Sequence, residues 1–71
     1  MSDLKKSFGI RLKSVRQAQN LTQEQLANQV DVTIETISFI ERGIHSPRFD
    51  LLEKLAKALN TPVHEFFIFN Q

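Results

Sequence analysis

Hydrophobic residues between positions 23 and 42 fall into two groups that each have helical spacing but differ in phase. The first group contains Leu26, Ala27 and Val30, and the second contains Ile37 and Ile40. Side chains that recur every three or four residues lie on one face of a helix. Because the spacing breaks between the two groups, two short helices joined by a tight turn fit the stretch, and one continuous helix does not.

Local signals place the ends of these two helices. Thr22 and Gln25 match the capping box, in which a hydroxyl and an amide each bond to the backbone at a helix start. Asp31 occupies the turn, where a positive φ is often needed and aspartate tolerates it. Thr33 is expected to cap the second helix. The spacing is typical of a helix-turn-helix motif, here residues 23–42, that places its second helix in the DNA major groove.

An amphipathic helix is predicted before this motif, from about Asp3 to Gln19, because large apolar residues recur there every three or four positions. Ser2 or Asp3 can cap its start. Gly9 lies inside the helix, where glycine costs about 1 kcal/mol relative to alanine. Either this cost is tolerated, or the missing side chain lets another helix come close, and we favour the close approach.

Two further helices are predicted after the motif, which Gly43 is expected to terminate. The fourth helix is expected to open at Ser46-Pro47, with the proline at its first position. Its buried stripe would consist of Phe49, Leu52, Leu55, Ala56 and Leu59. A short fifth helix is expected to begin at Thr61-Pro62, with Thr61 as its cap and Pro62 just inside.

The end of the chain carries more hydrophobic surface than one short helix can bury. Phe66, Phe67, Ile68 and Phe69 are consecutive in the sequence. Either these residues fold back onto the domain, or some of them bury against a second copy of the chain. We hypothesise that this tail, residues 66–69, forms a dimer contact with help from the fifth helix.

Length and composition indicate one small all-α domain comprising residues 1–71. Proline and glycine are scarce, and apolar and polar residues do not alternate as they would in strands. There is no cysteine, and two histidines alone cannot form a metal site, so no cofactor is expected. The hydrophobic runs are too short to cross a membrane, and the N-terminus lacks the apolar segment of a secretory signal. We therefore expect a cytoplasmic protein without a membrane partner.

Charge is unevenly distributed along the chain, although the net charge is only +1. Residues 1–20 carry Lys5, Lys6, Arg11, Lys13 and Arg16 against Asp3 alone. The four acidic residues between positions 21 and 41 have no basic neighbour in that stretch. A strongly basic footprint, which is the usual electrostatic sign of a DNA-binding protein, is therefore absent.

Individual residues of the motif could nevertheless contact DNA. The helix start at Thr22 offers N–H groups and partial positive charge to a phosphate, and Gln23 could add a side-chain donor. Ile34 and Phe39, on the outside of the second helix, could touch thymine methyl groups. Scattered exposed hydrophobic residues are also ordinary, and Phe39 could equally be half-buried against a neighbouring helix.

The chain resembles the phage repressor/Cro, or Xre-type, helix-turn-helix family over about residues 8–67. The segments that carry the resemblance are FGIRLKSVR, LTQEQLA, VTIETISFIERG, SP and LLEKLAKALNTPVHEFF, in that order. The resemblance implies a compact, lambda-repressor-like fold of five short helices, with the second and third forming the DNA-reading unit. It also implies a sequence-specific transcriptional regulator that binds a pseudo-palindromic operator in double-stranded DNA as a homodimer.

The resemblance further implies roles for residues at matching positions. Thr22 and Gln23 would hold a phosphate, and Arg42 and the loop to Arg48 would follow the DNA backbone, with Arg48 near the operator centre. The residues that would face base edges or adjacent phosphates are Thr33, Ile34, Glu35, Thr36, Ser38 and Phe39. Two positions depart from the family pattern: Asp31 replaces the usual turn glycine, and Glu35 places an acidic group on the reading helix, where it repels phosphates but can accept from cytosine N4.

Arg16 and Glu41 match a family pair that bridges the first and third helices. We predict a partly buried, bidentate ion pair between them. Such a pair would neutralise Glu41 and so reduce the unfavourable charge near the DNA.

Three classes of function compete for this sequence. The first is a DNA-binding regulator, which could also contact RNA polymerase or a cognate toxin; phage repressors, restriction–modification controller proteins and antitoxins all fit. The second is a protein-interaction module or antitoxin with the same fold, favoured by the apolar tail and the weak basic charge. The third, an enzyme, is not expected, because no carboxylate pair, serine–histidine set or glycine-rich phosphate loop has usable spacing.

Overall fold

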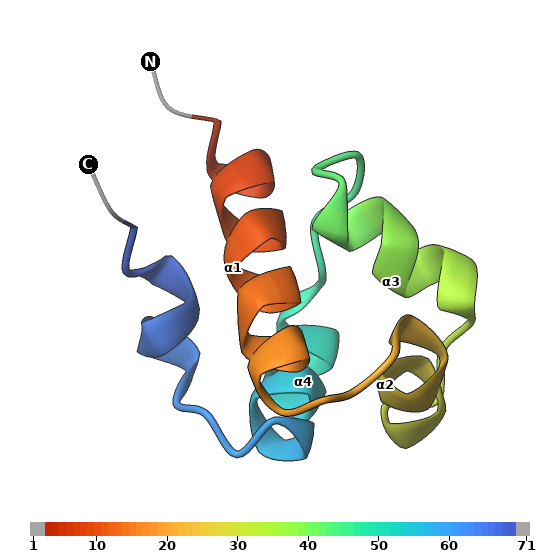
Figure 1. Ribbon diagram of the computed structural model, residues 1–71. Helices are drawn as coiled ribbons and strands as arrows, with labels where there is room; N and C mark the ends of the chain where they lie inside the picture. The colour runs from red at the N-terminus through yellow and green to blue at the C-terminus, as the bar shows by residue number, and fades with distance from the viewer. Residues whose placement is uncertain (1–2, 70–71) are drawn as a thin grey trace.

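The computed structural model describes residues 3–69, which form four α-helices and one 3₁₀ helix (Figure 1). The α-helices are α1 (Leu4–Ala18), α2 (Gln23–Gln29), α3 (Ile34–Glu41) and α4 (Phe49–Ala58), and the 3₁₀ helix is η1 (Val63–Phe67). The central helix is α1, with α3 on one side and η1 on the other. The all-helical prediction is confirmed, except that the fifth element is a 3₁₀ helix. Within residues 3–69, no helix has the length and apolar character needed to cross a membrane.

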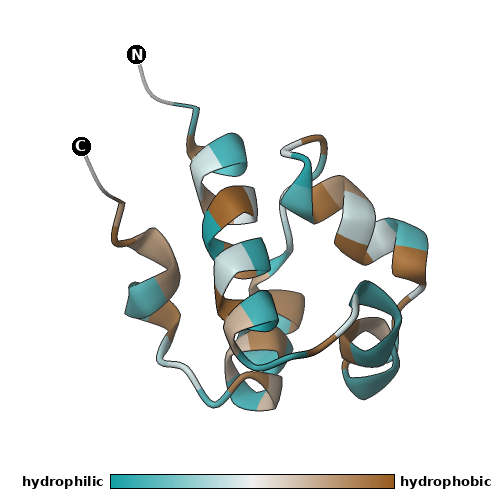
Figure 2. Ribbon diagram, viewed as in Figure 1, coloured by the Kyte–Doolittle hydropathy of each residue, from teal (hydrophilic) through white to brown (hydrophobic). Residues whose placement is uncertain are grey.

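A single hydrophobic core receives side chains from all five elements. The largest side chains with almost no exposed surface are Leu12, Leu26, Val30, Ile37, Ile40, Leu55, Leu59 and Phe66. Hydrophobic and hydrophilic residues are interspersed around each helix (Figure 2), so that one side of each can face this core. Burying a large aliphatic or aromatic side chain stabilises the fold by roughly 1.5–3 kcal/mol, and the core therefore determines how α2 and α3 are held.

The predicted caps and turns form as expected. The Thr22 hydroxyl accepts from the Gln25 amide nitrogen at 3.0 Å, and the Gln25 side chain accepts from the Thr22 amide nitrogen at 2.8 Å. Asp31 has φ 60 and Gly43 has φ 77, so both adopt the left-handed conformation at which the chain leaves a helix. Thr33 caps α3 by accepting from the amide nitrogen of Thr36.

The start of α4 differs from the prediction. The helix begins at Phe49 with Arg48 as its N-cap, so Pro47 lies in the preceding loop and not in the first turn. The Phe49 side chain is 88% exposed, and the buried stripe contains only Leu52, Leu55, Ala56 and Leu59. Spacing predicts which residues share a helix face, but it does not predict whether another element covers the first turn of that face.

The start of the fifth element also differs. Pro62 is the N-cap of η1, so the proline lies outside the helix and Thr61 precedes the cap. The Thr61 hydroxyl instead donates to the carbonyl of Leu59 at 2.9 Å, and so it closes the end of α4.

The tail folds back onto α1 through η1. Phe66 is 0% exposed, and its ring lies 5.8 Å from that of Phe8, centroid to centroid. The Arg11 side chain donates to the carbonyl of Glu65 at 3.0 Å and holds η1 against α1. Of the two alternatives for the tail, Phe66 therefore takes the first, because its side chain folds back into the core of its own chain. Phe67 and Ile68 remain 39% and 51% exposed.

The close approach predicted at Gly9 occurs between α1 and α3. A β-carbon at this position would lie 2.3 Å from the carbonyl oxygen of Ile40 and 2.7 Å from that of Glu41. These atoms belong to the backbone of α3 and cannot rotate away as a flexible side chain could. The glycine therefore sets how closely α3 packs on α1.

Gly9→Ala is expected to destabilise the domain by about 1–3 kcal/mol, as is typical of overpacking. In an exposed helix interior the same change would stabilise the helix by about 1 kcal/mol. A loss of stability in Gly9→Ala would therefore indicate that α3 lies against Gly9, and a gain would indicate that it does not. Chemical denaturation measures the free energy of unfolding of Gly9→Ala and of a control variant, Ser14→Ala. Ser14 is exposed on the same helix. An unchanged or higher stability of Gly9→Ala would show that α1 and α3 are not in this contact.

Candidate nucleic-acid interface

The two helices of the motif are held together by a tight turn and a small residue. Ala27 is 1% exposed, and its carbonyl accepts from the amide nitrogen of Val32 at 3.0 Å across the turn. Val32 packs against the core, and Ile37 and Ile40 face inward from α3. The chain bends sharply between α2 and α3 (Figure 1), so one side of α3 points away from the core.

The outward side of α3 carries most of the predicted base-facing residues. Thr33 and Glu35 are exposed, and Ile34 is 42% exposed. Thr36 and Ser38 are half-buried, and the Thr33 and Thr36 hydroxyls lie 3.0 Å apart, within hydrogen-bonding distance. This surface is a short polar helix face with one branched apolar side chain, and it can offer donors, acceptors and an apolar contact to a groove.

Phe39 packs against the loop that follows its own helix. Its ring lies 5.1 Å from the His45 ring in an edge arrangement, and the Arg42 guanidinium lies 5.7 Å from its centroid. The Phe39 carbonyl also accepts from the amide nitrogens of Ile44 and His45. Phe39 is half-buried by these contacts, against a loop and not against the neighbouring helix that the sequence suggested. It therefore positions the loop from Arg42 to Arg48.

The predicted ion pair between α1 and α3 is present and buried. Arg16 Nε lies 2.6 Å from Glu41 Oε2, and Arg16 Nη2 lies 3.0 Å from Glu41 Oε1, which makes the pair bidentate. Both residues are 7% exposed, and Arg16 Nη1 also donates to the carbonyl of Leu21 at 2.6 Å. A buried guanidinium and carboxylate that satisfy each other in this way neutralise the charge of Glu41.

Gln23 joins this pair at the start of α2. Its Nε2 atom donates to Glu41 Oε1 at 3.0 Å, so the amide is held in place before any ligand arrives. One N–H of the amide remains for another acceptor. The sequence did not indicate this link, because the two residues are 18 positions apart and share no helix face.

Basic residues gather around the loop that ends α3. Arg42 and Arg48 are exposed at its two ends. The Lys6 side chain of α1 covers Gly43 so closely that a β-carbon there would lie 2.6 Å from Lys6 Cγ. A basic side chain of α1, that of Lys6, therefore lies beside the loop that follows α3. The spacing of residues in the sequence did not indicate this contact.

Comparison with known proteins places this arrangement in a family. The sequence profile HTH_3, described as helix-turn-helix, matches residues 12–66. A protein of Archaeoglobus fulgidus described as an uncharacterized HTH-type transcriptional regulator is 41% identical over 61 residues, which cover 86% of each chain. Control protein C.MunI of Mycoplasma sp is 35% identical over 68 residues, covering 94% of this chain and 92% of its own.

A solved structure is similar over nearly the same region. The restriction–modification controller protein C.AhdI from Aeromonas hydrophila superimposes with a TM-score of 0.84 at 34% identity, covering 87% of this chain and 94% of its own. The fold, the profile match and these relatives agree with the Xre-type resemblance of the sequence. The chain belongs to the helix-turn-helix family HTH_3.

Proposed function

We propose that this protein is a sequence-specific DNA-binding transcriptional regulator that inserts α3 into the major groove of an operator. The observation that carries the proposal is the division of α3, with Ile37 and Ile40 buried while Ile34 and Glu35 remain exposed. The helix is braced from behind by α1 and α2, so its outer face can enter a groove without rearrangement.

Each residue's role in the proposed complex with DNA follows from its place on α2, on α3 or in the loop after α3. Thr33, Ile34, Glu35, Thr36 and Ser38 would face base edges or nearby phosphates, and Phe39 would support the following loop. Gln23, oriented by Glu41, and the backbone near Thr22 would hold one phosphate. Arg42 and Arg48 would follow the DNA backbone on the other side of the reading helix.

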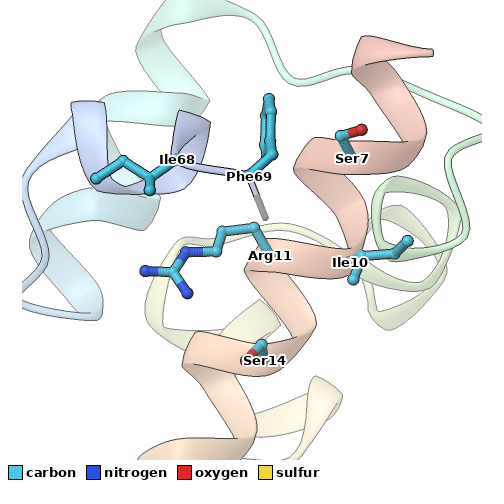
Figure 3. A pocket seen from close by; sticks show the side chains of 6 residues that line it. All are labelled: Ser7, Ile10, Arg11, Ser14, Ile68 and Phe69. Carbon is cyan, nitrogen blue, oxygen red and sulfur yellow. The ribbon is translucent and has the colours of Figure 1, made fainter. Parts of the chain in front are cut away.

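We further propose that the protein binds a pseudo-palindromic operator as a homodimer. A dimer would place two reading helices about 34 Å apart, one turn of the duplex. The part of the tail that remains available for the contact is Phe67, Ile68 and Phe69. Ile68 and Phe69 line a hollow on the surface of α1 together with Ile10, which is 68% exposed (Figure 3).

Alanine variants measured against a library of operator sequences test the proposal. Ile34→Ala and Glu35→Ala are expected to change which base is preferred at one position, by about 1–3 kcal/mol between the best and worst base. Gln23→Ala is expected to weaken binding to all sequences alike, because a phosphate carries no base identity. Gln29→Ala, at an exposed position on α2, serves as the control. If all three variants weakened every sequence equally, α3 would not be the reading helix.

A protein-interaction module or antitoxin with the same fold is the second candidate. Exposed hydrophobic residues such as Phe49 and Ile68, at 88% and 51%, favour it. A salt titration separates the two functions. DNA binding should weaken with a log–log slope of about 0.9 for each phosphate neutralised, and Arg42→Ala should lower that slope by about one phosphate. Association with a protein through apolar surface should change little with salt.

A further inference from the structure

Phe49 is the most exposed large hydrophobic side chain among residues 3–69, at 88%. Its side chain lines two hollows on the surface. The first, of about 240 Å³, is lined by Phe49 itself and, among others, by Leu4, Lys5, Pro47 and Phe67. The second is lined by Phe49 together with Asp50, Leu52, Glu53 and Val63. A protruding aromatic group and an apolar hollow therefore lie side by side on one face.

We propose that this face is the contact between two copies of the chain, with the Phe49 side chain of each copy seated in the first hollow of the other. A two-fold axis relates one patch to an identical patch, so a group and its receptor must both be present on that patch. Phe49 and the hollow beside it meet this requirement. A cavity of about 150 Å³ accommodates benzene, so the volume of the hollow suits a phenyl ring.

Charge complementarity favours a second copy over another apolar partner. Lys5 lines the first hollow, whereas Asp50 and Glu53 line the second. When Phe49 of one copy enters the first hollow of the other, Asp50 and Glu53 of the first copy approach Lys5 of the second. The two-fold symmetry repeats this pairing. An uncharged apolar peptide would fill the hollow but leave both the lysine and the exposed Phe49 ring unmatched.

This contact rests on the proposed function and makes its dimer more specific. Phe67 lines the same hollow, so the contact continues into the tail, but its centre is Phe49. Arg48 directly precedes Phe49, and an axis beside Phe49 would bring the two Arg48 residues together. That is the arrangement needed if Arg48 contacts DNA at the operator centre.

Sedimentation equilibrium of the full chain over a wide concentration range tests the contact. Phe49→Ser is expected to weaken dimerisation by at least roughly 30-fold, as expected for a central aromatic anchor. Ile44→Ser is the matched control, since Ile44 is 45% exposed and lines neither of the two hollows beside Phe49. Ile10→Ser tests the competing contact through the hollow that Ile10 shares with Ile68 and Phe69 (Figure 3). Lys5→Glu should weaken the dimer, and adding Asp50→Lys should restore it. Circular dichroism verifies that each variant is folded.

The outcomes separate this contact from the proposed function. A wild-type chain that stays monomeric, a Phe49→Ser dimer as tight as wild type, or a dimer broken only by Ile10→Ser would each overturn the contact. Phe49→Ser should still bind a single operator half-site with wild-type base preference, measured by fluorescence anisotropy. If the wild-type chain bound all DNA sequences equally, the proposed function would be wrong. The contact between two copies, as measured by sedimentation, would not be affected by that result.

Discussion

Arg16→Ala is expected to lower the free energy of unfolding by about 3–5 kcal/mol, the cost of removing one partner from a buried ion pair. Glu41 is 7% exposed and would lose its cationic partner in the protein interior. Its remaining side-chain partner would be the neutral amide of Gln23, at 3.0 Å. A domain of this size is stable by about 5 kcal/mol, so the variant should be partly unfolded at room temperature.

Thermal and urea denaturation measure this loss, and Arg11→Ala provides the control. Arg11 also faces a carboxylate, with Nη2 3.7 Å from Glu65 Oε1, but the two side chains are 34% and 39% exposed. An exposed pair contributes about 0–1 kcal/mol, and the hydrogen bond from Arg11 to the Glu65 carbonyl adds about 1–2 kcal/mol. Arg11→Ala should therefore lower the free energy of unfolding less than Arg16→Ala. The double variant Arg16→Met, Glu41→Leu should be more stable than Arg16→Ala, because it leaves no buried charge. An unchanged thermal midpoint in Arg16→Ala would show that the pair does not stabilise the fold.

The pair also links stability to the candidate interface. Glu41 receives Arg16 from α1 and Gln23 from α2 while belonging to α3. One carboxylate therefore connects the proposed reading helix α3 to the two helices that brace it. Removing it should disturb the position of Gln23 as well as the packing of α3, so the DNA affinity of Glu41 variants has to be compared at temperatures where the domain is folded.

The motif itself was predictable because its signals are local. Thr22 and Gln25 are three residues apart and cap one helix start, and the short side chain of Asp31 tolerates the positive φ of the turn. The phase change between Val30 and Ile37 reports the bend directly. The pairing of Arg16 with Glu41 is not local, and it was predictable only through the resemblance to a known family.

Features that depend on contacts between distant segments were not predictable in the same way. Periodicity assigned Phe49 to the buried stripe, but none of the described elements covers its side chain, which is 88% exposed. Burial of Phe39 against a neighbouring helix was one expectation, yet its ring packs on His45 and Arg42 of the loop that follows α3. The approach of Lys6 to Gly43 spans two helices. In each case the sequence specifies a face or a charge, and the tertiary packing decides what that group meets.

Phe66→Ala is expected to cost about 3–5 kcal/mol, as for other fully buried aromatic residues. Its ring is 0% exposed and contacts Phe8 of α1, so the truncation would leave a cavity where η1 meets the core. Phe67→Ala, at a position 39% exposed, should cost only about 1 kcal/mol. The two neighbouring positions are both phenylalanine and differ only in burial, so the two variants form a matched pair for denaturation experiments.

The dependence on protein concentration separates a core role from a dimer role. Stability that comes from subunit association changes with concentration, whereas stability from packing within one chain does not. The loss in Phe66→Ala should therefore be the same at low and high protein concentration. A loss that grows with concentration would return Phe66 to the dimer contact, and it would require η1 to leave α1 when two copies associate, because a side chain buried against Phe8 cannot reach a second copy.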